Sequence, residues 1–311
     1  MPLLSLPPEL ILSIVKQLHI PNVEVLAQTF NKRLYDACIP LLAKRIAARK
    51  HAKRMIARFG LPLFQSEMED VSCEQAKLLG FPSEHDISIP NKPPNLDYLN
   101  LNGDLSWLEP LDEKTARAME RYHRGPADGG TDLLDKLVAD AEKLGLVLPE
   151  GFIKFMSREE LQYRIPSAQA AFFTLGEDGL RKCPAAVDGG AGGYLIRIMA
   201  DQQWCWTWNL YLYPGEGKGH AVCGSAVDAN ANLDQIAEAL SDCKETTRDE
   251  FDQAKNEGFP LAWTRHLALT SFSFEEFLAT TYYEEQIWYV RYDDMELSQG
   301  LRKYIDNTYI K

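Results

Sequence analysis

The residue types that could support catalysis or phosphate binding gather between residues 215 and 223. The run Gly215-Glu-Gly-Lys-Gly-His220 has glycines and a lysine, as phosphate-binding loops do. It lacks the G-x-x-x-x-G-K-[ST] spacing, however, and no helix is predicted after it, so we interpret it as a hairpin turn. His220 and Cys223 are three positions apart on a predicted strand. Their side chains therefore point to opposite faces and cannot form a nucleophile–base pair through that strand.

The other chemically active residues also fail to form a recognisable centre. Carboxylate pairs at 275–276, 284–285 and 293–294 lie at or near predicted helix ends, and we interpret them as a helix N-terminus and a solvated acidic face. As an alternative, they form a patch that binds a basic partner. The cysteines contain no C-x-x-C pair and no histidine at metal-ligand spacing, so we expect reduced thiols filling core space. We therefore predict a protein that is not an enzyme, with no catalytic residue, cofactor or metal.

Composition restricts the class of protein further. Of 311 residues, 45% are hydrophobic and 25% charged, and the formal net charge is −12. The segment 32–58 carries nine basic residues against one acid, so the rest of the chain carries −20. This balance disfavours nucleic acid as a partner of most of the chain. No run approaches the ~20 apolar residues of a membrane span, and no leader pattern begins the sequence, so we expect no membrane partner and a cytoplasmic or nuclear location.

The elements at the start of the chain are predicted to be three helices. An apolar stripe at three- and four-residue spacing indicates a first helix beginning near Pro8. Asn22 is the expected N-cap of a second helix with Val23 facing inward. A third helix is expected from Lys32, with Leu34 and Cys38 facing inward. A unit of ~40 residues is near the lower limit of independent stability, so part of its apolar surface needs another cover.

The same residues resemble an F-box of the fungal type. The resemblance rests on Leu6-Pro7-x-Glu9-Leu10, Ile14, Leu18, Pro21 and Asn31-Lys-Arg-Leu-Tyr35, although many F-boxes have a tryptophan in the third helix where Leu34-Tyr35 stand here. It implies docking on a Skp-type adaptor protein of a cullin ubiquitin ligase. The implied adaptor-binding residues are Leu6, Pro7, Leu10, Ile11, Ile14 and Leu18. The alternative is a helical cap that packs on the chain's own downstream domain.

Two further regions are predicted after this module, which we place at residues 1–43. Residues 44–130 form a basic helix to Phe59 and then a proline-rich connector with local structure. We interpret the helix as a solvated connection that pairs with the acidic remainder, and a nucleic-acid or membrane-surface role is the alternative. Residues 131–311 read as helices, then strands at 193–200, 204–213 and 220–225, then helices at 233–240, at 247–258 and from Ser273 to near Tyr292. Ser157-Arg-Glu-Glu160 and Ser273-x-x-Glu276 are predicted capping boxes. Period-two alternation places Trp206, Trp208 and Leu210 on one side of the 204–213 strand, and because both of its faces are largely apolar we expect this strand to be central. The short connections require an antiparallel sheet, which gives an α+β domain.

This third region is similar to the SUKH superfamily, which includes bacterial immunity proteins and fungal Smi/Knr-like regulators. The resemblance rests on Leu148-Pro-x-x-Phe-Ile-x-Phe155, Gly193-Tyr-Leu-Ile, Asp201-Gln-Gln, the Trp/Tyr-rich strand to Tyr213, and Ser273-Phe-Glu-Glu-Phe277. It implies a protein-binding domain without catalysis that selects an unknown protein target. The candidate target-binding residues are Asp201, Gln202, Gln203, Tyr211, Tyr213, Tyr282, Tyr283, Glu284 and Glu285. A stand-alone regulator or immunity-like inhibitor of this type is the alternative function.

Overall fold

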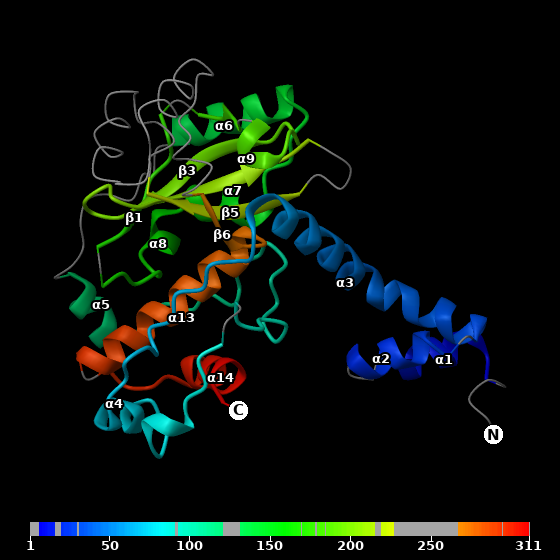
Figure 1. The fold of residues 1–311 in the computed structure, drawn as a ribbon, viewed down its shortest axis with the longest axis horizontal. Coiled ribbons are helices and arrows are strands. Elements are labelled where there is room, and N and C mark those ends of the chain that lie inside the picture. The colour runs from blue at the N-terminus through cyan, green and yellow to red at the C-terminus, as the bar shows by residue number, and fades with distance from the viewer. Residues whose placement is uncertain are drawn as a thin grey trace. The chain divides into compact units, whose positions relative to one another are not determined.

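The structure is a computed structural model that describes residues 6–15, 20–29, 31–90, 93–120, 131–168, 170–177, 179–183, 185–214, 219–226, 267–293 and 295–310. The chain forms two compact units, residues 1–57 and 58–311. The predicted helices at 233–240 and 247–258, Cys243 and the turn at 215–218 lie outside the described residues. The class is α+β, as predicted, with helices at both ends of the chain and an antiparallel sheet between them (Figure 1).

The smaller unit consists of three helices around its own core. These are α1 (Pro8–Val15), α2 (Ile20–Ala27) and most of α3 (Lys32–Phe59). Helix α1 begins at the predicted residue, but the predicted N-cap of α2 is wrong. Helix α2 begins at Ile20, because Pro21 fits the first turn, where a missing N–H has no cost. The core lies where the periodicity places it and contains Ile11, Val15, Val23, Leu34, Cys38 and Leu42.

Helix α3 is longer than the third helix of the predicted module. It runs without interruption from Lys32 to Phe59, so the predicted boundary at residue 43 falls inside it. The compact units divide after Ala57 instead. The last two residues of α3 belong to the larger unit, where the ring of Phe59 packs edge-on against Tyr211 at 4.9 Å and Arg58 lies over the ring of Tyr213 at 4.6 Å. The connector then forms α4 (Cys73–Leu78), η2 (Glu84–Asp86) and α5 (Glu113–Glu120).

One antiparallel sheet of six strands occupies the described part of the larger unit. Its order is β1 (Phe172–Phe173), β3 (Tyr194–Ala200), β4 (Thr207–Leu212), β5 (His220–Ser225) and β6 (Ala268–Ser271), and β2 (Arg181–Lys182) also pairs with β3. Strand β4 is central, as its two apolar faces predict. It begins at Thr207 rather than Trp204, because Asp201 accepts a hydrogen bond from the backbone N–H of Trp206 at 2.9 Å and Trp204 has a left-handed φ of 59°.

In the sequence of the larger unit, helices precede and follow the main strands of the sheet. Before the main strands come α6 (Thr131–Lys143), α7 (Glu150–Met156), α8 (Glu159–Gln162) and α9 (Ala185–Asp188), and after them α13 (Phe274–Tyr292) and α14 (Gln299–Thr308). Ser273 caps α13 as predicted, accepting from the N–H of Glu276 at 3.1 Å. The predicted capping box at Ser157 is wrong, because Ser157 ends α7 and Arg158 precedes α8. Helix α14 was not predicted.

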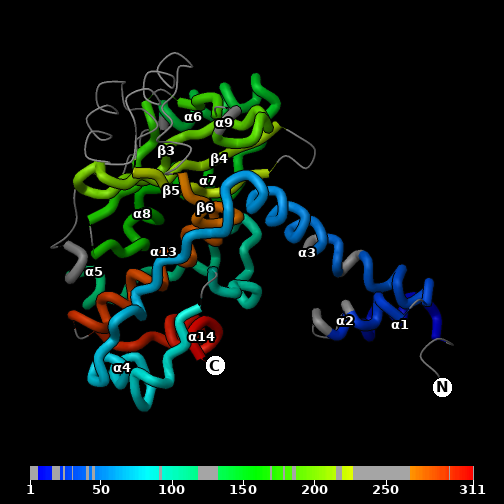
Figure 2. Tube along the Cα trace, viewed as in Figure 1, coloured from blue at the N-terminus to red at the C-terminus, as the bar shows by residue number. Residues whose placement is uncertain are grey.

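Helix α13 is the centre of the larger unit. It contacts β5, β6, α7, α4 and α14, and Phe274 packs edge-on against Phe152 of α7 at 5.2 Å. The segment that follows α3 runs alongside α13 (Figure 2). Hydrogen bonds hold it there: the N–H of Leu63 donates to the carbonyl of Leu269 at 2.6 Å, and Arg291 donates to the carbonyl of Glu67.

Candidate functional site

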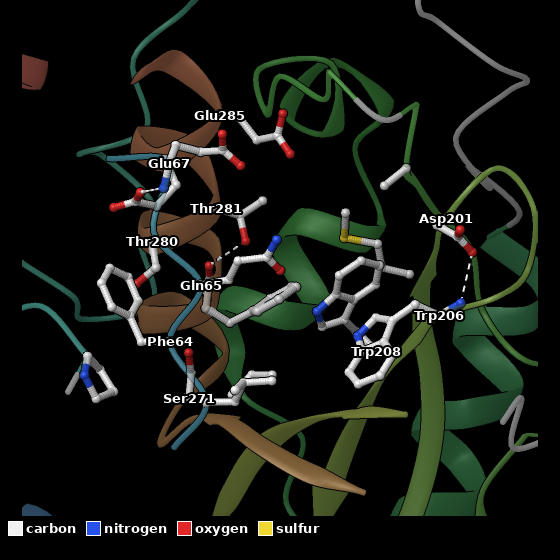
Figure 3. Close-up of a pocket in the computed structure, with 17 residues that line it drawn as sticks. Phe64, Gln65, Glu67, Asp201, Trp206, Trp208, Ser271, Thr280, Thr281 and Glu285 are labelled. Atoms are coloured by element: carbon white, nitrogen blue, oxygen red, sulfur yellow. Dashed lines mark hydrogen bonds between the residues drawn. The ribbon is translucent and has the colours of Figure 1, made fainter. Parts of the chain in front are cut away.

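A cavity of about 430 Å³ lies beside α13 in the larger unit (Figure 3). Its walls come from the segment 63–67, the end of β3, the start of β4, the end of β6 and the middle of α13. Glu67 and Glu285 lie on the α13 side, and Trp206, Trp208 and Asp201 lie on the opposite side. Ligand sites in proteins commonly enclose ~300–1,000 Å³. The cavity is therefore large enough for a small ligand or for a side chain of a partner.

Glu284 anchors the acidic side of this cavity through a buried hydrogen-bond network. Its Oε1 accepts from the hydroxyls of Tyr304 and Tyr309, the latter at 2.6 Å, and its Oε2 accepts from the N–H of Glu67 at 2.8 Å. The Tyr309 hydroxyl is also 2.8 Å from Ser66 Oγ. The chain's own donors thus use both oxygens of Glu284, which joins the 63–67 segment to α13 and α14.

The adjacent carboxylates have raised pKa values. Burial is the main cause for Glu284, and it outweighs the three hydrogen bonds, giving a pKa of about 7. Burial likewise raises the pKa of Glu285 to about 8, and the nearby charges of Glu67 and Glu284 add to this rise. The pKa of Glu67 is also raised by burial, with Arg291 acting in the opposite direction. A group of carboxyl groups that repel one another in a low-dielectric site favours protonation or a bound cation.

The opposite side of the cavity is aromatic. Trp208 lies 6.3 Å from the ring of Phe277, and Trp206 is held by the hydrogen bond of its N–H to Asp201. Gly224 on β5 makes room for Trp206, because a Cβ at this position would lie 2.7 Å from the indole ring. Glycine within a strand often marks such a close approach. The cavity therefore combines aromatic surface with carboxylates.

A second candidate site is the exposed side of α1 in the smaller unit. Ile11 and Val15 are buried in the core, whereas Leu10 is 52% exposed and Ile14 is 40% exposed. The pair Leu10 and Ile14 has the i, i+4 spacing of a helix that inserts apolar side chains into a partner's groove. On α2, Val25 is also 64% exposed. The smaller unit thus presents apolar surface beyond its own core.

The predicted adaptor-binding residues divide between this surface and the core. Pro7, Leu10 and Ile14 are exposed, Leu6 is partly buried against the core, and Leu18 lies outside the described residues. Including Ile11 was wrong, because its side chain is 1% exposed and packs inside the three-helix core. A partner can contact only the exposed half of the stripe.

The predicted target-binding residues also separate into two groups. Gln202 and Gln203 are exposed in the turn after β3, and Asp201, Glu284 and Glu285 line the cavity. The four tyrosines of this set do not form a surface. Tyr211, Tyr213, Tyr282 and Tyr283 are buried, and Tyr211 donates to buried Asp188 at 3.1 Å. They pack in the interior of the larger unit. The prediction that they belong to a target-binding surface is therefore wrong.

The five described cysteines differ in their burial. Burial raises the pKa of the Cys183 and Cys223 thiols, so both remain protonated at neutral pH and are poor nucleophiles. Cys38 is also buried, whereas Cys73 and Cys205 are exposed, contrary to the expectation that all thiols fill the core. Among the described residues, no group of three or more His, Cys, Asp or Glu side chains could hold a metal ion. No described helix is long and apolar enough to cross a membrane.

Comparisons of the chain with protein-family models, with curated proteins and with solved structures gave no match.

Proposed function

We propose that this chain is a non-catalytic substrate-recognition adaptor of a Skp–cullin–F-box-type ubiquitin ligase. The observation that carries the proposal is the division of the α1 stripe, with Ile11 and Val15 in the core and Leu10 and Ile14 exposed. Burial of one Leu or Ile side chain against a partner contributes ~1.5–3 kcal/mol. Two exposed side chains one turn apart on a short helix therefore offer a compact docking surface.

The separation into two units supports the second part of the proposal, recognition of a target. Each unit has its own buried core, so the smaller unit can engage the ligase while the larger unit binds another protein. The rate of ubiquitin transfer then increases through proximity alone, since the adaptor holds the target near the ubiquitin donor. In the larger unit, the cavity beside α13 and the exposed turn at Gln202 and Gln203 are the features available to a target.

The docking surface can be tested by titrating the full chain with a Skp-type adaptor protein in a calorimeter. The double variant Leu10→Asp/Ile14→Asp should abolish binding, because two carboxylates would have to be desolvated in an apolar contact. The matched control is Ala43→Asp/Ala47→Asp, which adds the same charges at the same spacing on exposed positions of α3. Protection of Cys38 from thiol labelling, followed by peptide mapping, verifies that the three-helix core is intact.

Two results would contradict the proposal. Retained binding in the α1 variant would show that these side chains are not the contact. No binding by the wild-type chain would leave the stand-alone SUKH-type regulator as the better account of the larger unit.

A further inference from the structure

We propose that the cavity beside α13 binds an organic cation, namely a primary ammonium or guanidinium group carried on an apolar stem. The proposal concerns the larger unit alone, and it holds whether or not α1 docks on an adaptor. It rests on the acidic lining of the cavity, on its aromatic wall and on its size.

The described residues that line the cavity include acids but no bases. These 17 lining residues include four acids, Glu67, Asp201, Glu284 and Glu285, and no lysine, arginine or histidine. Glu284 is occupied by Tyr304, Tyr309 and the N–H of Glu67, and Asp201 accepts from Trp206. Glu285 is different, because within the described residues its one hydrogen bond is from the N–H of Ala168 to Oε2, at 2.6 Å. Its other oxygen is available to a donor on a ligand.

The aromatic wall suits the rest of such a ligand. Trp206, Trp208 and Phe277 line the cavity with Phe64 and Leu63, so they can bury a chain of methylene groups at ~0.8 kcal/mol for each group. An ammonium or guanidinium group near an indole face gains ~0.5–2 kcal/mol from the cation–π interaction. A volume of about 430 Å³ accommodates a stem of several carbons together with its charged head. An anion, by contrast, would face four carboxyl groups.

Proton release provides a signature that an apolar cavity would lack. The pKa of about 8 means that Glu285 is largely protonated at pH 7 in the empty cavity. A bound cation favours the carboxylate and lowers this pKa, so binding at pH 7 should release a proton. The other titratable groups that face the site are Glu67 on the 63–67 segment, Asp201 after β3, and Glu284 on α13. Affinity for a cation should accordingly rise between pH 6 and about pH 8, as Glu284 and Glu285 ionise.

The test is calorimetric titration of the full chain with three probes of equal length, hexylamine, hexanol and hexanoate. Hexylamine should bind at least tenfold more tightly than hexanol, and hexanoate should bind more weakly than both. Titrations in two buffers of different ionisation enthalpy should show release of about one proton with hexylamine at pH 7. Equal affinity for hexylamine and hexanol, or no heat of binding with hexylamine at about 1 mM, would overturn the proposal.

Variants locate the site within the molecule. Glu285→Gln should weaken hexylamine binding about tenfold, the loss of one charge-assisted hydrogen bond, and should reduce proton release at pH 7. The amide oxygen of glutamine can still accept from Ala168, so the fold should be unchanged. Glu142→Gln, at an exposed position of α6 outside the cavity, is the matched control and should bind as the wild type does. Identical binding and proton release by wild type and Glu285→Gln would refute the role of Glu285.

The same cation can come from a free amine or from a basic side chain of a protein. A short end-capped peptide with one lysine, compared with the same peptide containing norleucine, distinguishes these sources. Binding of the lysine peptide more tightly than hexylamine would identify a protein side chain as the ligand. Weaker binding than hexylamine would identify a free amine. Equal binding of the lysine and norleucine peptides would contradict charge recognition.

Discussion

The substitution Glu284→Gln tests the buried network that holds the cavity together. In the wild type, both oxygens of Glu284 accept hydrogen bonds, two from tyrosine hydroxyls and one from the N–H of Glu67 at 2.8 Å. A glutamine oxygen can still accept from Tyr304 and Tyr309, but its NH2 group then faces the N–H of Glu67. A buried donor left without an acceptor costs ~1–3 kcal/mol, so the variant should be destabilised by this amount at pH 4.5.

The size of this effect should depend on pH, because Glu284 titrates and glutamine does not. Its pKa is about 7 in the folded chain against an ordinary value of 4.5. The unfolded state therefore loses its proton first, and the free energy of unfolding of the wild type falls as the pH rises from 4.5 through about 7. At about 1.4 kcal/mol for each pKa unit, the fall due to this side chain is about 3 kcal/mol. The variant avoids this loss and should equal or exceed the wild type in stability at pH 8.

Urea unfolding followed by tryptophan fluorescence measures the difference. All six tryptophans follow residue 57 in the sequence, so the signal reports on the larger unit. Comparing the two proteins at each pH removes the contributions of Glu276 and Glu285, whose pKa values are also raised. A stability difference between wild type and variant that stays constant from pH 4.5 to pH 8 would refute the reasoning.

Two further predictions, each with a control variant, concern the packing of the sheet and the N-cap of α13. Gly193→Ala would place a Cβ 2.2 Å from the ring of Tyr211, so urea unfolding should show a loss of ~1–3 kcal/mol. Gly300→Ala on α14 is its control, because the nearest contact would be an ordinary 3.7 Å, and it should be neutral or stabilising. Ser273→Ala removes the N-cap of α13 and should cost ~1 kcal/mol in the same assay, whereas Ser273→Asp should retain most of the stability.

Helical periodicity was enough to predict the smaller unit but not its exposed side. The spacing places Val23, Leu34 and Cys38 inside, and all three are buried. On α1, however, the apolar stripe is wide enough to have an inner and an outer half, and periodicity alone does not say which half faces the core. The positions of α2 and α3 decide this, and they turn Ile11 inward and leave Leu10 exposed. That is why the predicted adaptor-binding set contained one core residue.

The cavity could not be predicted, because its walls come from distant parts of the sequence. Glu67 and Glu284 are 217 positions apart and meet only because the segment after α3 runs beside α13. Nothing in the short stretch around Glu67 indicates this contact. Strand alternation did predict that Trp206 and Trp208 share a side with Leu210, and both tryptophans line the cavity. The role of Gly224 beside Trp206 has no local signal other than a glycine within a strand.

Most of the buried residues that were predicted to lie on a binding surface are tyrosines. A tyrosine ring is apolar and its hydroxyl is polar, so sequence alone cannot separate a buried tyrosine from one at an interface. Here the hydroxyl of Tyr211 donates to Asp188, and the hydroxyl of Tyr282 donates to the carbonyl of Glu109 at 3.4 Å. The omission of α14 was avoidable, because Ser298 caps it, accepting from Leu301 at 3.1 Å, and the apolar residues that follow have helical spacing.

Two consecutive residues of α13 have different roles, and the difference follows from the geometry of a helix. Successive side chains are ~100° apart around the axis, so Glu284 reaches Tyr304 and Tyr309 while Glu285 reaches Ala168. The carboxylate of Glu284 accepts three hydrogen bonds from donors of the chain, and the carboxylate of Glu285 accepts one. Glu284→Gln should therefore destabilise the chain at pH 4.5, where it leaves the N–H of Glu67 without an acceptor, whereas Glu285→Gln should weaken cation binding. If Glu285→Gln lost as much stability at pH 4.5 as Glu284→Gln, or if Glu284→Gln weakened cation binding as much as Glu285→Gln, this division of roles between the two glutamates would be wrong.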